Sequence, residues 1–384
     1  MITKKGNLLL INDHGLVGGG AERRIQLLIK ELIKRKFFRE IHILQHEIAE
    51  TLASDVPFHT CSTKNSGIIT KNIIQQHAID LVQVHHLAAI STRPIIAAKQ
   101  LHKSVIFFAH DYWPICGRRS FYSKWDFLCK KAYFPKCVTC IGLKPYLNIV
   151  RNKKHLNLCD LGIAPSQFCI DRYENHKVLK GKWIKVMPWI DTTLFNTKGL
   201  ETIKQEKNII LYVGPLTKVK GAYLLAEALK FIQKEISSVI LRYVGSGQEK
   251  ESQDRMQIEQ ILTTDDTLKQ VEFLGKKSPA ELKYEYARAT VFVCCPLLAE
   301  MFGQTWAQAL ACGTPVIATN VGSIPELLQN RGTVVDPDPK ILSQAIIKCL
   351  KNPQPLVEET IFSMEPMIKI YEKKILPLLM NNKA

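Results

Sequence analysis

The sequence of 384 residues lacks a long apolar run and a repeated segment. Its longest uncharged stretch, Met301–Pro325, is interrupted by glutamine, asparagine, glycine and proline, so it is not expected to span a membrane. The start of the chain has an apolar run of only four residues, which is too short for a secretory signal peptide. A hydrophobic content of 46% excludes a disordered chain. We therefore expect a cytoplasmic globular protein of two or three domains.

Acidic residues are scarce in the first half of the chain. Lysine and arginine number 52 against 35 aspartate and glutamate, which gives a formal charge of +17. Residues 1–200 carry about +16 of this charge and residues 201–384 about +1. A one-sided basic surface attracts phosphate groups, as in nucleic acid, anionic lipid or a phosphorylated substrate. The plainer alternative is a solvated basic face without a partner.

Disulfide bonds are not expected, because the 11 cysteines occur in a sequence without an export signal and cytosolic thiols stay reduced. Cys116, Cys129, Cys137 and Cys140 have the spacing C-x(12)-C-x(7)-C-x(2)-C. Four thiolates of this kind could hold a structural zinc ion in tetrahedral geometry. The alternative is four reduced cysteines in an ordinary loop.

Short apolar runs alternate with helical patterns along the whole chain, which predicts parallel sheets covered by helices on both faces. Such doubly wound sheets bind ligands at the carboxyl ends of their strands, and two facing domains would form a cleft between those ends. We expect strands at Asn7–Ile11, Ile41–Leu44, Leu81–Val84, Val105–Ala109, Ile184–Met187, Ile209–Val213, Val239–Val244, Val271–Leu274, Val291–Cys294 and Val316–Ala318.

The polar, aperiodic stretch Thr192–Lys207 predicts a linker between two α/β domains of nearly equal size. The first domain would comprise residues 1–197, with a cysteine-rich loop at 112–142, and the second residues 198–363. Residues 364–384 have a helical apolar spacing.

Three segments follow predicted strands and carry residues suited to binding phosphate or sugar. The first, Gly15–Glu22, is rich in glycine and opens a helix, so it predicts either a tight turn or a phosphate cradle. The second, Val213–Gly221, contains Lys220 at a helix start, where a lysine either neutralises a phosphate or is simply solvated. The third, Glu300–Ala318, begins with a carboxylate that either contacts sugar hydroxyls or caps the following helix.

Together these segments resemble the family-4 retaining glycosyltransferases, which have two Rossmann-like domains facing across a cleft (the GT-B fold). Glu300–Val316 resembles the signature E-x-F-G-x(4)-E-A-x-A-x-G-x-P-V, and Val213–Gly221 resembles the turn V-G-R-L-x-x-x-K-G. Three shorter segments resemble the P-S-x-F, N-G-I-D and G-G-x-x-E-L segments of the family, namely Ser166–Phe168, Pro188–Asp191 and Gly322–Leu327.

The resemblance implies a role for each matching residue. Glu300 and His110 would face the donor sugar, and Lys220 would bind the diphosphate. The remaining donor-binding residues would be Gly18, Gly19, Gly20, Phe302, Gly303 and Gln308.

The sequence departs from the family pattern at three places, one of which is Pro188–Asp191, where the usual Asn-Gly is missing. Gln308 replaces the glutamate that contacts the ribose, and Pro215 replaces the arginine of the V-G-R turn. An amide can still accept and donate hydrogen bonds to a ribose. Pro215 removes one phosphate-binding cation, for which Lys218 could compensate.

The resemblance implies transfer of a sugar from a UDP- or GDP-type donor to a glycan or lipid-linked acceptor, without a catalytic metal or other required cofactor. In this fold the last helix often crosses back to the first domain. The alternatives are a sugar-nucleotide epimerase of the same fold, a basic nucleic-acid-binding protein and a non-catalytic family member. Basic residues interleaved with aromatic ones between Trp113 and Lys154 fit either a membrane surface or single-stranded nucleic acid. Because the resembled family often adds sugars to lipid-linked acceptors, the resemblance implies a peripheral site on the inner membrane face.

Overall fold

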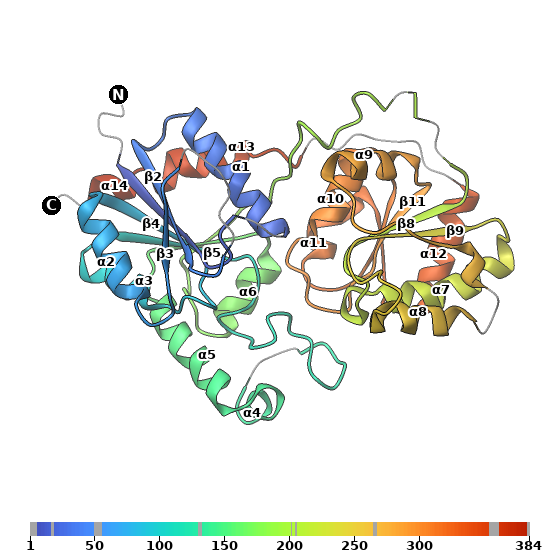
Figure 1. Ribbon diagram of the computed structural model, residues 1–384, viewed down its shortest axis with the longest axis horizontal. Coiled ribbons are helices and arrows are strands. Elements are labelled where there is room, and N and C mark those ends of the chain that lie inside the picture. Colours follow the sequence, from blue (N-terminus) through green and yellow to red (C-terminus); the bar gives the residue numbers. More distant parts are fainter. Residues whose placement is uncertain are drawn as a thin grey trace. The chain divides into compact units, whose positions relative to one another are not determined.

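The computed structural model describes residues 6–16, 19–49, 56–129, 133–200, 202–203, 206–263, 267–352 and 361–381. The chain divides into two compact units (Figure 1). Unit 1 comprises residues 1–187 and 364–384, and unit 2 comprises residues 188–363. The division falls between Met187 and Pro188, before the boundary that the sequence predicts after Thr197.

Unit 1 contains a parallel sheet with the strand order β3-β2-β1-β4-β5-β6-β7. Its strands are β1 (Asn7–Asn12), β2 (Glu40–His46), β3 (Phe58–Cys61), β4 (Ile79–His86), β5 (Ser104–Phe108), β6 (Leu161–Ala164) and β7 (Trp183–Lys185). Its helices are α1 (Gly20–Lys34), α2 (Ser66–Gln76), α3 (Arg93–Gln100), α4 (Lys136–Ile141), α5 (Leu143–Leu156), α6 (Gln167–Asn175), α13 (Glu365–Ile370), the π-helical turn η4 (Tyr371–Ile375) and α14 (Leu378–Asn381).

Unit 2 contains a second parallel sheet with the order β10-β9-β8-β11-β12-β13. Its strands are β8 (Ile209–Val213), β9 (Ile240–Val244), β10 (Val271–Phe273), β11 (Val291–Cys294), β12 (Val316–Thr319) and β13 (Thr333–Val335). Its helices are α7 (Ala222–Glu235), α8 (Gln253–Thr263), α9 (Pro279–Arg288), α10 (Gln304–Ala311), α11 (Ile324–Leu328) and α12 (Pro339–Lys351), with 3₁₀ turns η1 (Lys218–Lys220), η2 (Thr267–Gln270) and η3 (Gln329–Arg331).

The strand orders confirm the predicted fold class of two doubly wound, Rossmann-like α/β domains. In each sheet the order reverses beside the first strand, between β1 and β4 in unit 1 and between β8 and β11 in unit 2. Ligands of this fold bind at the carboxyl edge next to such a reversal. The topology therefore marks one candidate position for a site in each unit.

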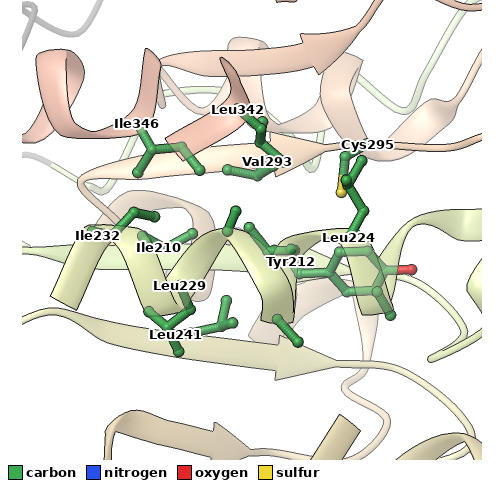
Figure 2. Packing of buried hydrophobic residues seen from close by; sticks show 14 of the residues in the cluster. Ile210, Tyr212, Leu224, Leu229, Ile232, Leu241, Val293, Cys295, Leu342 and Ile346 are labelled. Carbon is green, nitrogen blue, oxygen red and sulfur yellow. The ribbon is translucent and has the colours of Figure 1, made fainter. Parts of the chain in front are cut away.

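Amphipathic helices cover the second sheet because their apolar residues recur on one face. In α7 the buried residues include Leu225, Leu229 and Ile232, at helical spacing. They pack against strand residues such as Ile210 and Leu241, and Figure 2 shows this layer. The core therefore fixes where β8 ends and α7 begins, which is where the candidate site of unit 2 lies.

The stretch predicted to be a linker is packed into unit 2. Phe195 is 1% exposed and makes an edge-to-face contact with Tyr286, with 6.2 Å between the ring centroids. Lys283 Nζ donates a hydrogen bond of 3.1 Å to Asn196 Oδ1. The polar composition of this stretch suggests a linker, but the buried ring of Phe195 packs the stretch against unit 2.

Candidate functional site

The carboxyl edge of the second sheet brings together two residues that the sequence singles out. Lys220 ends the 3₁₀ turn after β8, and Glu300 lies in the loop after β11. Lys220 Nζ donates a hydrogen bond of 2.7 Å to Glu300 Oε2. Because β8 and β11 flank the reversal of strand order, this ion pair lies where a doubly wound sheet binds its ligand.

The Lys220–Glu300 pair is only partly shielded from solvent. The exposed fractions of the two side chains are 36% and 17%. Burial lowers the pKa of Lys220, but the charge and the hydrogen bond of Glu300 outweigh it, so the pKa is raised above its ordinary value. Lys220 is therefore a cation at neutral pH that an anionic ligand can reach.

A close glycine contact fixes the backbone of Glu300. A Cβ atom at Gly322, whose φ is +61°, would lie 2.2 Å from the carbonyl oxygen of Glu300. Ser323 N–H donates a hydrogen bond of 2.8 Å to the same oxygen. The segment after β12 therefore packs against the loop after β11 and fixes the position of the Glu300 backbone. This close contact requires a glycine at position 322.

The helix α10 opens directly after Glu300 and presents its first amides at this edge. Gly303 is the N-cap with a φ of +78°, and no side chain caps the helix. Phe302 is buried, and its carbonyl oxygen accepts a hydrogen bond from the indole of Trp306. The first amides of a helix have no partner within it and favour anions. This geometry suits a phosphate near Gly303.

Gln308 lies one turn further along α10 and faces a buried neighbour. It is 8% exposed, and its Oε1 atom accepts a hydrogen bond of 3.1 Å from the hydroxyl of Tyr286. The structure thus shows a core contact for Gln308, and its contact with a donor ribose stays a prediction.

The carboxyl edge of the first sheet carries a buried ion network. His86, at the end of β4, lies 2.6 Å from Asp13 through Nδ1 and 3.1 Å from Asp111 through Nε2. Burial lowers the pKa of His86, but its hydrogen bonds to Asp111 and Asp13 raise it to about 9. Burial raises the pKa of Asp13, but the hydrogen bond and charge of His86 and the backbone hydrogen bond from Ala89 together outweigh burial. The pKa of Asp13 is therefore below its ordinary value. His86 is therefore an imidazolium between two carboxylates.

His110 belongs to a second cluster, in which it contacts Arg24 on one side and His85 on the other. Arg24 Nη2 lies 3.2 Å from His110 Nδ1, and His85 Nδ1 lies 2.8 Å from His110 Nε2. An arginine only donates, so His110 accepts at Nδ1 and donates from Nε2 to His85. Burial and the charge of Arg24 hold the pKa of His110 well below its usual range. Both of its nitrogens are thus engaged, and its proximity to a donor sugar stays a prediction.

The glycine-rich loop is described in part. Gly18 lies outside the described residues, while Gly19 is the N-cap of α1 and Gly20 is its first residue. A cavity of about 510 Å³ next to this loop is lined by polar groups of Asp13, His14, Glu22 and His46. The cavity lies at the carboxyl ends of β1 and β2, so unit 1 also has a candidate ligand site.

The network around His86 could have been found in the sequence. Three neighbouring strands of one sheet each end in a polar doublet that contains histidine, namely Asp13-His14, His85-His86 and His110-Asp111. Parallel strands end at one edge, so repeated histidines after apolar runs predict a cluster there. Judged singly, each histidine resembles an ordinary core residue.

The four cysteines of the predicted zinc site come near one another. All four line one cavity of about 30 Å³ in unit 1, and none of them forms a disulfide bond. Burial raises the pKa of Cys129 and Cys137, and the neighbouring thiols add to this effect. Among the described residues, however, three metal-ligating atoms come within 4.8 Å of one another only in His42/His59/His77 and in Asp13/His14/His86.

Comparisons with known proteins agree with this architecture. Residues 196–361 match the sequence model of the family described as glycosyl transferases group 1. Spore coat protein SA of Bacillus subtilis is 31% identical over 124 residues, which cover 32% of this chain and 33% of that protein. An uncharacterized glycosyltransferase of Methanocaldococcus jannaschii is 23% identical over 345 residues, which cover 85% of each chain. The chain therefore matches about a third of the first relative's length and most of the second's.

Solved structures share the fold at low sequence identity. The crystal structure of Anabaena HepE in complex with UDP and glucose is similar with a TM-score of 0.67 and 16% identity, covering 98% of both chains. In the described part of this chain, no helix has the length and apolarity required to cross a membrane.

Proposed function

We propose that this chain, whose residues 196–361 match the model of the family described as glycosyl transferases group 1, is a retaining glycosyltransferase of that family. It would move a hexose from a nucleotide diphosphate to a glycan or lipid-linked acceptor in the synthesis of a cell-surface polysaccharide or glycolipid. The Lys220–Glu300 pair at the strand-order reversal of unit 2 carries this proposal. A cation for the diphosphate and a carboxylate for sugar hydroxyls stand side by side there.

The residues of unit 2 would act mainly on the leaving group. As the bond between the anomeric carbon and the phosphate oxygen breaks, negative charge grows on the diphosphate. Lys220 and the first amides of α10 would stabilise that charge. Glu300 would accept hydrogen bonds from sugar hydroxyls and hold the anomeric carbon in place.

The acceptor proton needs no separate base in this proposal. The departing phosphate oxygen takes the proton from the acceptor hydroxyl as the new glycosidic bond forms on the same face of the sugar. The acceptor would bind at the edge of unit 1, in the cavity lined by Asp13, His14, Glu22 and His46. Carboxylates and imidazoles suit the hydroxyl groups of a sugar or polyol.

The first test is nucleotide binding, measured as a thermal shift with UDP, GDP, ADP and CMP at about 1 mM and without added metal. A ligand present at about 100 times its dissociation constant adds about 2.7 kcal/mol of stability. Lys220→Ala should weaken the binding of the active diphosphate about 10- to 100-fold, because it removes one charge-assisted contact. Lys276→Ala is the matched control, since Lys276 is an exposed lysine after β10 of the same sheet.

The second test is turnover. Glu300→Gln should retain nucleotide binding and lower transfer about 10- to 100-fold, because a charged acceptor for the sugar hydroxyls is lost. Product analysis separates a transferase from an epimerase, which alters the sugar without an acceptor. Absence of any nucleotide shift would instead favour a non-catalytic or nucleic-acid-binding protein, the latter with a steep salt dependence.

We also propose that unit 1 docks on an anionic membrane surface through α5. Leu143, Leu147 and Val150 lie at positions i, i+4 and i+7 of this helix and are 58%, 55% and 48% exposed. Lys144 and Arg151 beside them are also exposed. An apolar stripe flanked by cations matches the boundary between anionic headgroups and acyl chains.

Sedimentation with liposomes tests this surface. Binding should rise with the fraction of anionic lipid. Leu147→Glu should weaken binding about 30-fold, because it removes apolar area that would enter the membrane and adds a negative charge that anionic lipid repels. Ile68→Glu is the control, because Ile68 on α2 is an equally prominent apolar side chain at 66% exposure. Equal loss in both variants, or binding that ignores anionic lipid, would contradict the proposal.

A further inference from the structure

Four cysteines of unit 1 surround one small cavity, and the proposed transfer reaction uses none of them. The cavity of about 30 Å³ is lined by Cys116, Cys129, Cys137 and Cys140. That volume suffices for about one water molecule or ion. The four residues lie within the 25 residues 116–140 but come from three pieces of backbone, namely the turn at Cys116, the segment at Cys129 and α4.

The segment between β5 and α5 brings these pieces together with little regular structure. The amide of Cys116 donates a hydrogen bond of 2.8 Å to Tyr112, and the amide of Cys129 donates one of 2.6 Å to Phe121. An isolated antiparallel bridge between Tyr122 and Leu128 lies between these two cysteines. Cys129 thus directly follows a tight hairpin.

The third piece is α4, which carries Cys137 and Cys140 one turn apart. Residues three apart on a helix share a face, so both thiols can point at one ligand. The helix has only six residues and no buried side chain. A helix this short is unstable unless contacts outside it hold it. Lys136 Nζ lies 4.2 Å from the centre of the Phe127 ring, and the side chain of Ile141 lies against Gly117. A metal ion held by Cys137 and Cys140 would add a further anchor for α4.

The four cysteines at the cavity are half-buried, whereas two fully buried cysteines donate hydrogen bonds from their sulfur atoms to backbone carbonyls. Cys61 Sγ donates to Gln45 O at 3.7 Å, and Cys295 Sγ donates to Gly221 O at 3.2 Å. At the cavity, the backbone of Tyr133 is the hydrogen-bond partner of the Cys137 thiol, and none of the four cysteines forms a disulfide bond. Four reduced thiols that line one small space have the chemistry of a metal cradle.

The cluster of His42, His59 and His77 has a simpler explanation. His42 Nδ1 lies 3.1 Å from His59 Nε2, and His42 Nε2 lies 3.2 Å from Glu40 Oε2. These hydrogen bonds account for the short contacts of His42 without an ion.

We propose that the four cysteines bind one structural zinc ion, which fastens α4 to the hairpin and to the turn at Cys116. Zn–S bonds of about 2.3 Å require sulfur atoms about 3.8 Å apart. The present positions are more open, since no three of the sulfurs lie within 4.8 Å of one another in the described residues. Binding would therefore draw the sulfurs inward. Lys136 and Arg118 line the same cavity and balance the negative charge of four thiolates.

Metal analysis of the full-length chain tests this proposal, independently of any transferase assay. Protein purified with a reductant and without chelator should contain about one zinc ion per chain. Cys140→Ser should lose most of this zinc. Cys349→Ser is the control, because Cys349 is a partly buried cysteine of α12 in unit 2 and should leave the zinc content unchanged.

A second measurement keeps the proposal open to refutation even if Cys140→Ser does not fold. Cobalt(II) exchanged into the wild-type protein should show thiolate charge-transfer absorption and the intense visible bands of a tetrahedral site. Chelator should expose residues 109–142 to limited proteolysis. A metal-free wild-type protein, a cobalt spectrum without thiolate bands, or disulfide bonds among these cysteines under reducing conditions would overturn the assignment.

Discussion

At the scale of single residues, the charge of His86 depends on its two carboxylate neighbours. Its contacts with Asp13 and Asp111 raise its pKa to about 9, above the ordinary value of 6.5. A group with a raised pKa binds its proton more tightly in the folded chain. Its stabilising effect is therefore complete below pH 6.5 and is lost as the pH rises through about 9.

His86→Gln should accordingly remove a pH dependence of unit 1. In the wild type we expect the free energy of unfolding to fall by up to about 3 kcal/mol between pH 6.5 and pH 9. Hydrogen exchange of the β4 amides, corrected for the intrinsic effect of pH, measures this change. His102→Asn, at an exposed histidine of the same unit, should keep the wild-type dependence. An unchanged slope in His86→Gln would show that the two carboxylates do not hold the charge.

The sequence identifies Lys220 and Glu300 more readily than His86 for a physical reason. Lys220 precedes Gly221 and the backbone of Glu300 lies against Gly322, and both glycines are required by close backbone contacts that leave a pattern in the sequence. His86 acquires its character only from Asp13 and Asp111, which are 73 and 25 residues away in the chain. The sequence shows that histidines follow three strands, but the burial of His86 and its contacts with both carboxylates are defined only when the strands are placed side by side.

At the scale of elements, every predicted strand is present, whereas β3, β6 and β13 were not predicted. β3 and β13 are edge strands of four and three residues, too short to display a period. β6 contains Gly162, which is unfavourable in a strand, but the ring of Trp183 fills the space that a Cβ atom would occupy. The tertiary contact therefore decides the strand at this position.

The turn between β8 and α7 depends on a single glycine. A Cβ atom at Gly221, whose φ is +83°, would lie 1.7 Å from the carbonyl oxygen of Cys295. Gly221→Ala should therefore destabilise unit 2 by about 3 kcal/mol or more and displace Lys220. Gly199→Ala is the matched control, with a φ of +75° and no atom within 4 Å of the added carbon, and should cost about 1 kcal/mol. Urea denaturation of the two variants compares them, and equal losses would contradict the role of the close contact.

At the scale of the whole molecule, the chain leaves unit 1 at Met187 and returns to it at Met364. The returning segment is held by an apolar face, because Met367, Ile368, Tyr371 and Ile375 are all buried. Unit 1 is therefore made of two pieces of chain, and its stability should depend on residues at the far end of the sequence.

Tyr371 is the main anchor of the returning segment. Its ring stacks with Phe37 at 6.2 Å and meets Phe38 edge-on at 6.4 Å, and its hydroxyl accepts a hydrogen bond from the amide of Gln83 on β4. Tyr371→Ala removes a fully buried ring and leaves Gln83 without this partner, so it should destabilise unit 1 by about 3 to 5 kcal/mol.

Hydrogen exchange distinguishes this effect from general unfolding. In Tyr371→Ala the amides of β4 and α1 should exchange faster, while those of β8 in unit 2 should keep their protection, because the anchor contacts only unit 1 in the described residues. Tyr284→Ala, at a tyrosine that is 45% exposed, should change neither set. Faster exchange in β8 of Tyr371→Ala would mean that the two units unfold as one, and the division of the chain into independent units would then be wrong.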